Sequence, residues 1–148
     1  IKKGIRDLNL VPGRLEKYEI RPGVFAVIDY AHTPDALEKS LTALRNITKN
    51  RLIVVFGCGG DRDKAKRAVM GELSEKLADY VIVTSDNPRS EDPDLIIRDI
   101  VDGMHSPEKY ETITDRKEAI FKAVRVSGAN LFNLPLINST TLSVMSAC

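Results

Sequence analysis

The stretch RLIVVFGCGGDRDKAKR, residues 51–67, decides the fold class of this 148-residue chain. Its first part, Arg51–Gly57, is a continuous apolar run rich in β-branched residues, which is the pattern of a strand covered on both faces. Glycines at positions 57, 59 and 60 end this strand. Helical periodicity then resumes over Lys64–Ala78, where the apolar residues at helical spacing are Ala65, Val69, Leu73 and Leu77. A buried strand that enters a helix through a glycine-rich turn is typical of a parallel α/β sheet.

Another strand and helix precede this stretch. Val24–Asp29 (VFAVID) is a short apolar run that ends in a charge, and it predicts a buried strand. Thr33-Pro34-Asp35 then predicts the start of a helix. Threonine suits the N-cap, proline the first helical position and aspartate the positive end of the helix dipole. The apolar residues that follow at helical spacing are Leu37, Leu41 and Leu44.

Strand and helix alternate again downstream, which completes the pattern of a Rossmann-like α/β fold with a mostly parallel sheet and helices on both faces. Tyr80–Ser85 predicts a third strand, and Pro93–Met104 predicts a third helix. Tyr110–Ile113 predicts a short strand, and Asp115 with Glu118 forms a pattern like a capping box at the start of a further helix. The residues expected to face inward from these two helices are Leu95, Ile96, Ile100, Ile120, Ala123 and Val124.

The last part of the chain differs in composition. From Val126 to Cys148 no residue is charged, although charged residues make up 29% of the chain. Leu131–Ile137 is compatible with a strand, but Pro135 interrupts it. The change in composition predicts a divergent or non-native tail over residues 126–148.

Composition and charge also exclude several classes of function. A formal net charge of +1, from 22 basic and 21 acidic residues, gives no global field that would attract nucleic acid or an anionic membrane. The apolar runs are too short to span a membrane, and the N-terminus does not resemble a signal peptide. Cys58 and Cys148 are too few for a disulfide framework and lack zinc-ligand spacing. We therefore expect a cytoplasmic protein without nucleic-acid or membrane partners.

Three polar loops follow the carboxyl ends of the predicted strands. They span residues 29–35 (DYAHTPD), 57–64 (GCGGDRDK) and 86–91 (DNPRSE). In an open parallel sheet, ligands bind beyond the carboxyl ends of the strands. We therefore expect the three loops to meet at one edge of the sheet and to form the ligand site.

The first loop carries Asp29 at the end of its strand and His32 three residues later. A carboxylate in this place can accept hydrogen bonds from ribose hydroxyls, and an imidazole can contact phosphate or a metal-bound water. The alternative interpretation is that Asp29 caps a turn and that His32 is simply exposed.

The second loop, rich in glycine, lets the backbone approach a ligand closely, and the helix that follows can hold an anion at its start. It is neither a dinucleotide fingerprint nor a P-loop, because no Gly-Lys-Ser/Thr follows, so this chain lacks its own triphosphate cradle. Arg62 is the group best suited to bind a carboxylate, because its planar guanidinium donates two parallel hydrogen bonds. The alternative is a solvated first helical turn made of Arg62, Lys64, Lys66 and Arg67.

The third loop begins with Asp86-Asn87-Pro88-Arg89, which places an acceptor, an amide and a guanidinium on a turn stiffened by proline. Such a set suits a zwitterionic ligand, with its carboxylate on Arg89 and its ammonium on Asp86. The same residues are also a common signal for a turn and a helix start.

Taken in order, these segments resemble the C-terminal domain of the Mur ligases, and within that family the group that adds meso-diaminopimelate. The similarity covers about residues 11–125 and rests on four motifs at family-like spacing. They are VPGR (11–14), DYAHTPDALEKSL (29–41), FGCGGDRDKAKR (56–67) and VTSDNPRSEDP (83–93).

The resemblance implies an ATP-dependent acid–amino-acid ligase of peptidoglycan synthesis. ATP would phosphorylate the glutamyl carboxylate of UDP-N-acetylmuramoyl-L-alanyl-D-glutamate, and the amine of meso-diaminopimelate would attack the acyl phosphate. Mg²⁺ would be bound mainly by a central domain outside this chain. Residues 1–13 would be the end of that domain or a linker, residues 14–125 the C-terminal domain, and residues 126–148 the tail. This chain would then hold no catalytic residue and no metal ligand, and alone it would be inactive and monomeric.

Site residues follow from the resemblance motif by motif. Arg14 and Asp29 correspond to residues that contact ATP, with Asp29 on the ribose, and His32 would lie near the phosphates. Arg62 and the turn Asp86-Asn87-Pro88-Arg89 correspond to the amino-acid pocket. Asn-Pro-Arg in this turn marks the members that use meso-diaminopimelate, whose second carboxylate needs a cationic partner.

This chain departs from the family pattern in two places. Ala65 stands where a glycine is common, and the later Gly-Lys-Gly-His-Glu segment, which completes the diaminopimelate pocket, is replaced by the uncharged tail. Two alternatives stay open: an L-lysine-adding Mur ligase domain, and a non-catalytic Rossmann-like module that binds a nucleotide or an amino acid. An NAD-dependent dehydrogenase is disfavoured by the missing dinucleotide fingerprint.

Overall fold

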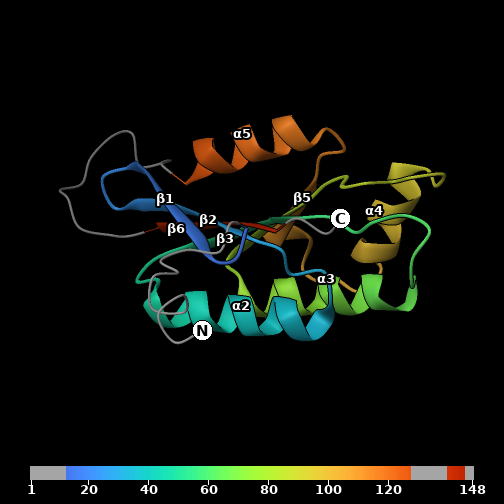
Figure 1. Ribbon diagram of the computed structural model, residues 1–148, viewed down its shortest axis with the longest axis horizontal. Helices are drawn as coiled ribbons and strands as arrows, with labels where there is room; N and C mark the ends of the chain where they lie inside the picture. Colours follow the sequence, from blue (N-terminus) through green and yellow to red (C-terminus); the bar gives the residue numbers. More distant parts are fainter. Residues whose placement is uncertain (1–12, 128–139, 146–148) are drawn as a thin grey trace, which may run out of the picture.

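In the computed structural model, which describes residues 13–127 and 140–145, six strands form one sheet in the order β1-β2-β6-β3-β4-β5 (Figure 1). β1 runs antiparallel to β2, and all the other neighbouring strands are parallel. The predicted Rossmann-like α/β class, with a mostly parallel sheet, is therefore confirmed. The strands are β1 (Glu16–Arg21), β2 (Val24–Asp29), β3 (Leu52–Phe56), β4 (Tyr80–Val83), β5 (Tyr110–Thr112) and β6 (Thr140–Met145).

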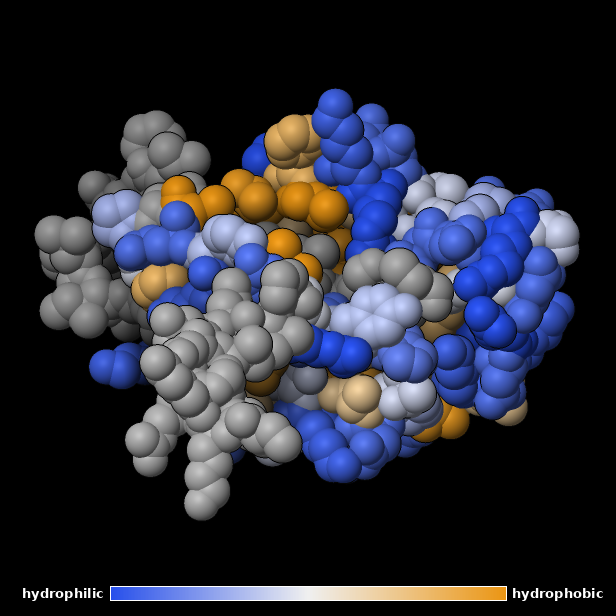
Figure 2. Space-filling model, in the orientation of Figure 1, coloured by the Kyte–Doolittle hydropathy of each residue, from blue (hydrophilic) through white to orange (hydrophobic). Residues whose placement is uncertain are grey.

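Helices cover both faces of this sheet. In Figure 1, α2 and α3 lie below the strands, and α5 lies above them. Within the described residues α5 is the only helix on its face, and Figure 2 shows hydrophobic surface gathered beside it on an otherwise mostly hydrophilic side. No helix in the described part of the chain is long and apolar enough to cross a membrane. The helices are α2 (Pro34–Ile47), α3 (Ala65–Leu77), α4 (Pro93–Val101), the 3-10 turn η1 (Pro107–Lys109) and α5 (Arg116–Val126).

The helix starts follow the predicted chemistry. Thr33 is the N-cap of α2, and its hydroxyl accepts a hydrogen bond from the Ala36 N–H at 3.3 Å. Asp115 is the N-cap of α5, and its carboxylate accepts from the Glu118 N–H at 2.9 Å. The apolar stripe predicted for α2 is confirmed, because its buried residues are Leu37, Leu41 and Leu44.

The inward faces of α3 and α4 were predicted less well. In α3 the buried residues are Arg67, Met70, Gly71 and Ser74, whereas Val69 is 43% exposed. The reason is that α3 packs against α2 and α4 as well as the sheet, so no single apolar stripe describes it. In α4, Ile96 and Ile100 are buried as predicted, but Leu95 is 51% exposed and Ile97 takes its place.

The sheet contains two strands that the sequence analysis did not predict, β1 at its edge and β6 at its centre. β6 lies between β2 and β3, with its backbone parallel to both, so that Leu142 is in register with Ala26 on one side and Ile53 on the other. The strand considered near Leu131–Ile137 falls outside the described residues.

Candidate functional site

The three polar loops meet at one edge of the sheet. They follow β2, β3 and β4. These strands point the same way because β2 and β3 both pair in parallel with β6, and β4 pairs in parallel with β3. Lys66 Nζ, from the first turn of α3, donates to the carbonyl oxygen of His32 at 2.8 Å and so joins the first loop to the second. Arg89 Nη1 donates to the carbonyl oxygen of Gly60 at 2.6 Å and joins the third loop to the second. The predicted convergence of the loops is therefore observed.

Asp29, at the end of β2, holds a turn of the preceding segment in place. Its side chain is only 6% exposed. Oδ2 accepts a hydrogen bond from the Leu15 N–H at 2.9 Å, and Oδ1 accepts from Ser40 Oγ at 3.4 Å. Leu15 has a φ of 45°, a left-handed conformation that is uncommon for such a residue and needs support from its surroundings. In this structure Asp29 therefore anchors a turn, as in the alternative interpretation, and its ribose contact stays a prediction.

The turn that Asp29 anchors places Arg14 over the first loop. Arg14 Cζ lies 5.0 Å from the centroid of the Tyr30 ring, within the range of a cation–π contact. The Tyr30 and His32 rings lie 5.1 Å apart, and His32 Nδ1 is 3.2 Å from the Tyr30 carbonyl oxygen. Arg14, Asp29 and His32 are thus brought together at the end of β2. Tyr30, which links them, was not singled out from the sequence, although it lies between two of the predicted site residues.

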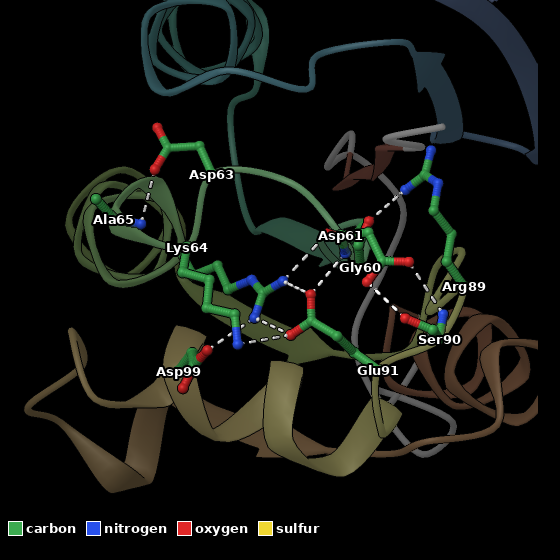
Figure 3. Close-up of polar contacts among 11 residues, drawn as sticks. Gly60, Asp61, Asp63, Lys64, Ala65, Arg89, Ser90, Glu91 and Asp99 are labelled. Atoms are coloured by element: carbon green, nitrogen blue, oxygen red, sulfur yellow. Dashed lines mark hydrogen bonds and ion pairs between the residues drawn. The ribbon is translucent and has the colours of Figure 1, made fainter.

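The second and third loops are joined along their length. The Gly60 N–H donates to the carbonyl oxygen of Asn87 at 2.8 Å. Ser90 donates to the Asp61 carboxylate twice, from its hydroxyl at 2.7 Å and from its N–H at 3.2 Å (Figure 3). A Cβ atom on Gly60 would lie 1.9 Å from the carbonyl oxygen of Pro88, so only glycine permits this close approach.

Two residues in these joined loops have left-handed backbone conformations. Asp61 has a φ of 52° and Arg89 a φ of 50°. Non-glycine residues rarely adopt this region, and they remain there when their surroundings fix them. Asp61 is held by Ser90, and Arg89 by the carbonyl oxygen of Gly60. The hydrogen bonds from Ser90 also lower the pKa of the Asp61 carboxyl below its ordinary value.

The predicted amino-acid pocket contains two arginines that reach solvent. Arg62 and Arg89 are both exposed, and within residues 13–127 neither forms an ion pair. Asp86 differs, because its side chain is 7% exposed and its Oδ1 lies 3.5 Å from Arg116 Nη1 at the start of α5. The second and third loops therefore each expose one guanidinium group, and the turn directs the Asp86 carboxylate toward α5.

Behind the loops lies Arg67, for which one interpretation of the sequence was a solvated first helical turn. Its side chain is 0% exposed and is paired with Glu91 of the third loop at 2.8 Å and with Asp99 of α4 at 2.8 Å. The Arg67 guanidinium is the main cause that lowers the pKa of Glu91 to about 2, and a hydrogen bond from the Asp61 N–H adds to the effect. The solvated-turn interpretation is wrong for Arg67, because two carboxylates compensate its burial.

No group of three His, Cys, Asp or Glu side chains in the described ranges, 13–127 and 140–145, is arranged to hold a metal ion. Arginines, a histidine and a tyrosine lie at this edge. Such donors suit anionic ligands, namely carboxylates and phosphates.

Comparison with known proteins identifies the family of this arrangement. A family model described as "Mur ligase, glutamate ligase domain" matches residues 13–132. UDP-N-acetylmuramoyl-L-alanyl-D-glutamate--2,6-diaminopimelate ligase 1 of Clostridium acetobutylicum is 54% identical over 126 residues, which are 84% of this chain and 26% of the relative. The corresponding ligase of Syntrophomonas wolfei is 50% identical over 129 residues, covering 86% of this chain and 26% of the relative.

A solved structure supports the same assignment. A structure of UDP-N-acetylmuramoyl-L-alanyl-D-glutamate--2,6-diaminopimelate ligase superposes with a TM-score of 0.75 at 38% identity, over 91% of this chain and 26% of that chain. The chain thus spans about a quarter of the length of the relatives it matches. Since the family model covers most of the described residues and the sequence motifs lie where the three loops meet, this chain belongs to the Mur ligase family and matches its glutamate ligase domain.

Proposed function

We propose that this chain is the C-terminal domain of an ATP-dependent ligase that adds meso-diaminopimelate to UDP-N-acetylmuramoyl-L-alanyl-D-glutamate in peptidoglycan synthesis. The observation that carries the proposal is the turn Asp86-Asn87-Pro88-Arg89, which is bonded to the glycine-rich loop so that two exposed arginines share one edge. The names of the relatives support the same substrate pair. The domain would comprise residues 14–125 together with β6, because β6 pairs with both β2 and β3 in the middle of the sheet.

The proposed reaction forms one amide bond. ATP transfers its γ-phosphoryl group to the glutamyl carboxylate, which gives an acyl phosphate and ADP. The amine of meso-diaminopimelate attacks the acyl carbon, and the tetrahedral intermediate expels phosphate. Mg²⁺, held mainly by a central domain, would neutralise charge on the phosphates. The role of this domain is to hold the amino acid and the nucleotide in a reactive orientation.

The amino-acid end of the site is assigned to the second and third loops. Arg62 and Arg89 would bind carboxylates of diaminopimelate, because a guanidinium pairs with a carboxylate through two hydrogen bonds. Diaminopimelate has one carboxylate more than lysine, so a pocket with two guanidinium groups favours it. Asp86 would attract an ammonium of the ligand while its pairing with Arg116 keeps the turn in place.

The nucleotide end of the site is assigned to the first loop. Arg14, stacked on Tyr30, and His32 offer positive or hydrogen-bonding groups toward phosphate. Asp29, already hydrogen-bonded to the Leu15 N–H and Ser40, would accept a ribose hydroxyl at the edge of its carboxylate. This end is separate from the diaminopimelate pocket, so variants of the two ends are expected to affect different substrates.

Steady-state kinetics of the full-length ligase that contains this domain test the proposal. Arg89→Ala is expected to lower kcat/KM for meso-diaminopimelate on the order of 100-fold or more, because it leaves a ligand carboxylate unpaired. Arg62→Ala is expected to act in the same direction, whereas KM for ATP stays near the wild-type value. Arg98→Ala, which removes an exposed arginine from α4, is the matched control and is expected to change neither.

Two results would reject the assignment. Unchanged diaminopimelate kinetics in Arg89→Ala would show that the pocket is elsewhere. A wild-type ligase that uses L-lysine in preference to diaminopimelate would replace the substrate with that of the lysine-adding group.

A further inference from the structure

Arg67 is a fully buried guanidinium that contacts three separate segments, namely the second loop, the third loop and α4. Its Nη2 and Nη1 donate to the two oxygens of Glu91 at 2.8 and 3.0 Å, a bidentate contact with the third loop. Nη1 also donates to Asp99 Oδ2 on α4 at 2.8 Å. Nη2 is 3.3 Å from the carbonyl oxygen of Gly59 in the second loop. One side chain of α3 therefore fixes both loops and α4 relative to each other.

Glu91 is the point at which these contacts converge on the third loop. Besides Arg67, its carboxylate accepts from the Asp61 N–H at 2.6 Å and from Lys64 Nζ at 3.1 Å (Figure 3). Both of these donors belong to the second loop or its end. Glu91 follows Arg89 by two residues, so its bonds hold the backbone segment that carries the proposed ligand-binding arginine.

We infer that Arg67 and Glu91 are positioning residues for the amino acid: they hold the Asp86–Arg89 turn against the glycine-rich loop, so that Arg62 and Arg89 meet the carboxylates of the ligand in one fixed arrangement. The inference rests on the proposed function. Neither residue is a binding residue itself, because Arg67 is buried and Glu91 is occupied by donors of the protein.

Burial of these charges is better explained by positioning than by stability. Removing an arginine and a carboxylate from water is unfavourable, and a protein with apolar residues in the same place is often as stable or more so. The apolar core below α3 and α4 is already formed by residues such as Met70, Ile96 and Ile100. What an apolar replacement would not provide is a directional bond from α3 to the backbone and side chains of both loops.

The two acidic partners of Arg67 separate the roles. Glu91 lies in the loop that carries Arg89. Asp99 lies on α4, so its bond with Arg67 links α4 to α3. Glu91→Gln and Asp99→Asn each neutralise one partner of the same buried guanidinium without a large change of shape. They are therefore a matched pair. Both variants weaken the pairing of Arg67, but only Glu91→Gln is expected to disturb the turn.

The test is kinetic and uses the full-length ligase. Glu91→Gln is expected to raise KM for meso-diaminopimelate at least tenfold, with changes below twofold in KM for ATP and for the UDP-linked substrate. Asp99→Asn is expected to raise KM for diaminopimelate less than threefold. A Glu91→Gln enzyme with wild-type KM for diaminopimelate would overturn the inference. So would an equal effect of the two variants, or an equal rise of KM for all three substrates.

The exposed residue Asp61 provides a second test, which stays informative even if the Glu91→Gln variant fails to fold. Asp61→Ala removes both hydrogen bonds from Ser90 and the side chain that suits a left-handed residue, whereas Asp61→Asn keeps an acceptor and tolerates this conformation. Asp61→Ala is expected to raise KM for diaminopimelate at least threefold, and Asp61→Asn less than twofold. Equal kinetics of the alanine variant and wild type would contradict the inference.

Arg89→Ala distinguishes failure of the inference from failure of the proposed function. If Arg89→Ala impairs diaminopimelate use and Glu91→Gln does not, the pocket stands and the positioning role is wrong. If Arg89→Ala has no effect, the pocket is wrong and the positioning role falls with it.

Discussion

Glu91 is a carboxylate that stays ionised far into the acidic range. Its pKa falls from the ordinary 4.5 to about 2, first because Arg67 donates to it and then because the Asp61 N–H does. A carboxyl group whose pKa is lower in the folded state than in the unfolded state stabilises the fold at pH values above its unfolded-state pKa. This stabilisation is lost as the pH falls through the folded-state pKa. The contribution of Glu91 is therefore complete at neutral pH and disappears between about pH 5 and pH 2.

Thermal unfolding at several pH values measures this contribution. The melting temperature of the wild-type chain is expected to exceed that of Glu91→Gln at pH 7, and the gap is expected to shrink steadily from pH 5 to pH 3. Glu72→Gln, at an exposed position on α3, is the control and should follow the wild type throughout. A gap that is constant over this range would mean that Glu91 titrates like an ordinary glutamate.

At the residue scale, the sequence predicted which side chains lie on the loops but not how deeply they are buried. Asp29 was placed correctly at the end of β2, and His32, Arg62 and Arg89 were placed correctly after β2, β3 and β4. The reason is that polar groups at the end of an apolar strand mark its carboxyl end. Arg67 was not recognised, because an arginine in a basic first helical turn is usually solvated. Its partners lie 24 and 32 positions further along the chain, so no pattern in the sequence around Arg67 predicts them.

At the scale of elements, α3 and α4 approach closely where glycine leaves room. A Cβ atom on Gly71 of α3 would lie 2.2 Å from the carbonyl oxygen of Ile100 in α4. Backbone cannot yield as a flexible side chain does, so any larger residue forces the helices apart. The same two helices follow the second and third loops, so their separation also sets the distance between the two parts of the proposed amino-acid pocket.

The substitution Gly71→Ala has two opposite effects on the free energy of unfolding, and the typical size of each is known. Alanine gains about 0.5–1 kcal/mol of helix propensity over glycine, whereas overpacking costs about 1–3 kcal/mol. We expect the clash to dominate, with a net loss on the order of 1–2 kcal/mol in the free energy of unfolding. Urea denaturation of the chain measures it, and Glu72→Ala on the exposed side of the same helix is expected to stay within about 0.5 kcal/mol of wild type. A stabilised Gly71→Ala would mean that the helices separate without cost.

The elements themselves were largely predictable, and their faces less so. Caps and proline positions gave the starts of α2 and α5 because these signals are local. The buried side of α3 was not predictable from periodicity, because this helix is enclosed by α2 and α4 as well as the sheet. β6 has a sequence rich in serine and threonine, and its central position depends on pairing with β2 and β3, which lie more than 80 residues before it.

At the scale of the whole molecule, this chain would supply only part of the reaction centre of the proposed ligase. The sheet brings arginines, His32 and Tyr30 to one edge, but the 148 residues contain no Gly-Lys-Ser/Thr motif that would cradle a triphosphate. In the proposed function that cradle and the magnesium ligands belong to a central domain, and the chain spans about a quarter of the length of its relatives. The edge described here would then be completed only when another domain faces it.

The chain alone is therefore expected neither to hydrolyse ATP nor to form an amide bond. The reason is that the phosphoryl group would lack both its cradle and its metal, although the contacts from Arg14, Asp29 and His32 remain. Release of phosphate measured with ATP, diaminopimelate and the UDP-linked substrate should equal the enzyme-free rate, whereas the full-length ligase turns over under the same conditions. Calorimetry with ATP and with diaminopimelate completes the experiment. Weak binding of both agrees with a site shared between domains, while tight binding by the isolated chain would favour a self-sufficient nucleotide- or amino-acid-binding module, because such a module needs no second domain to close its site.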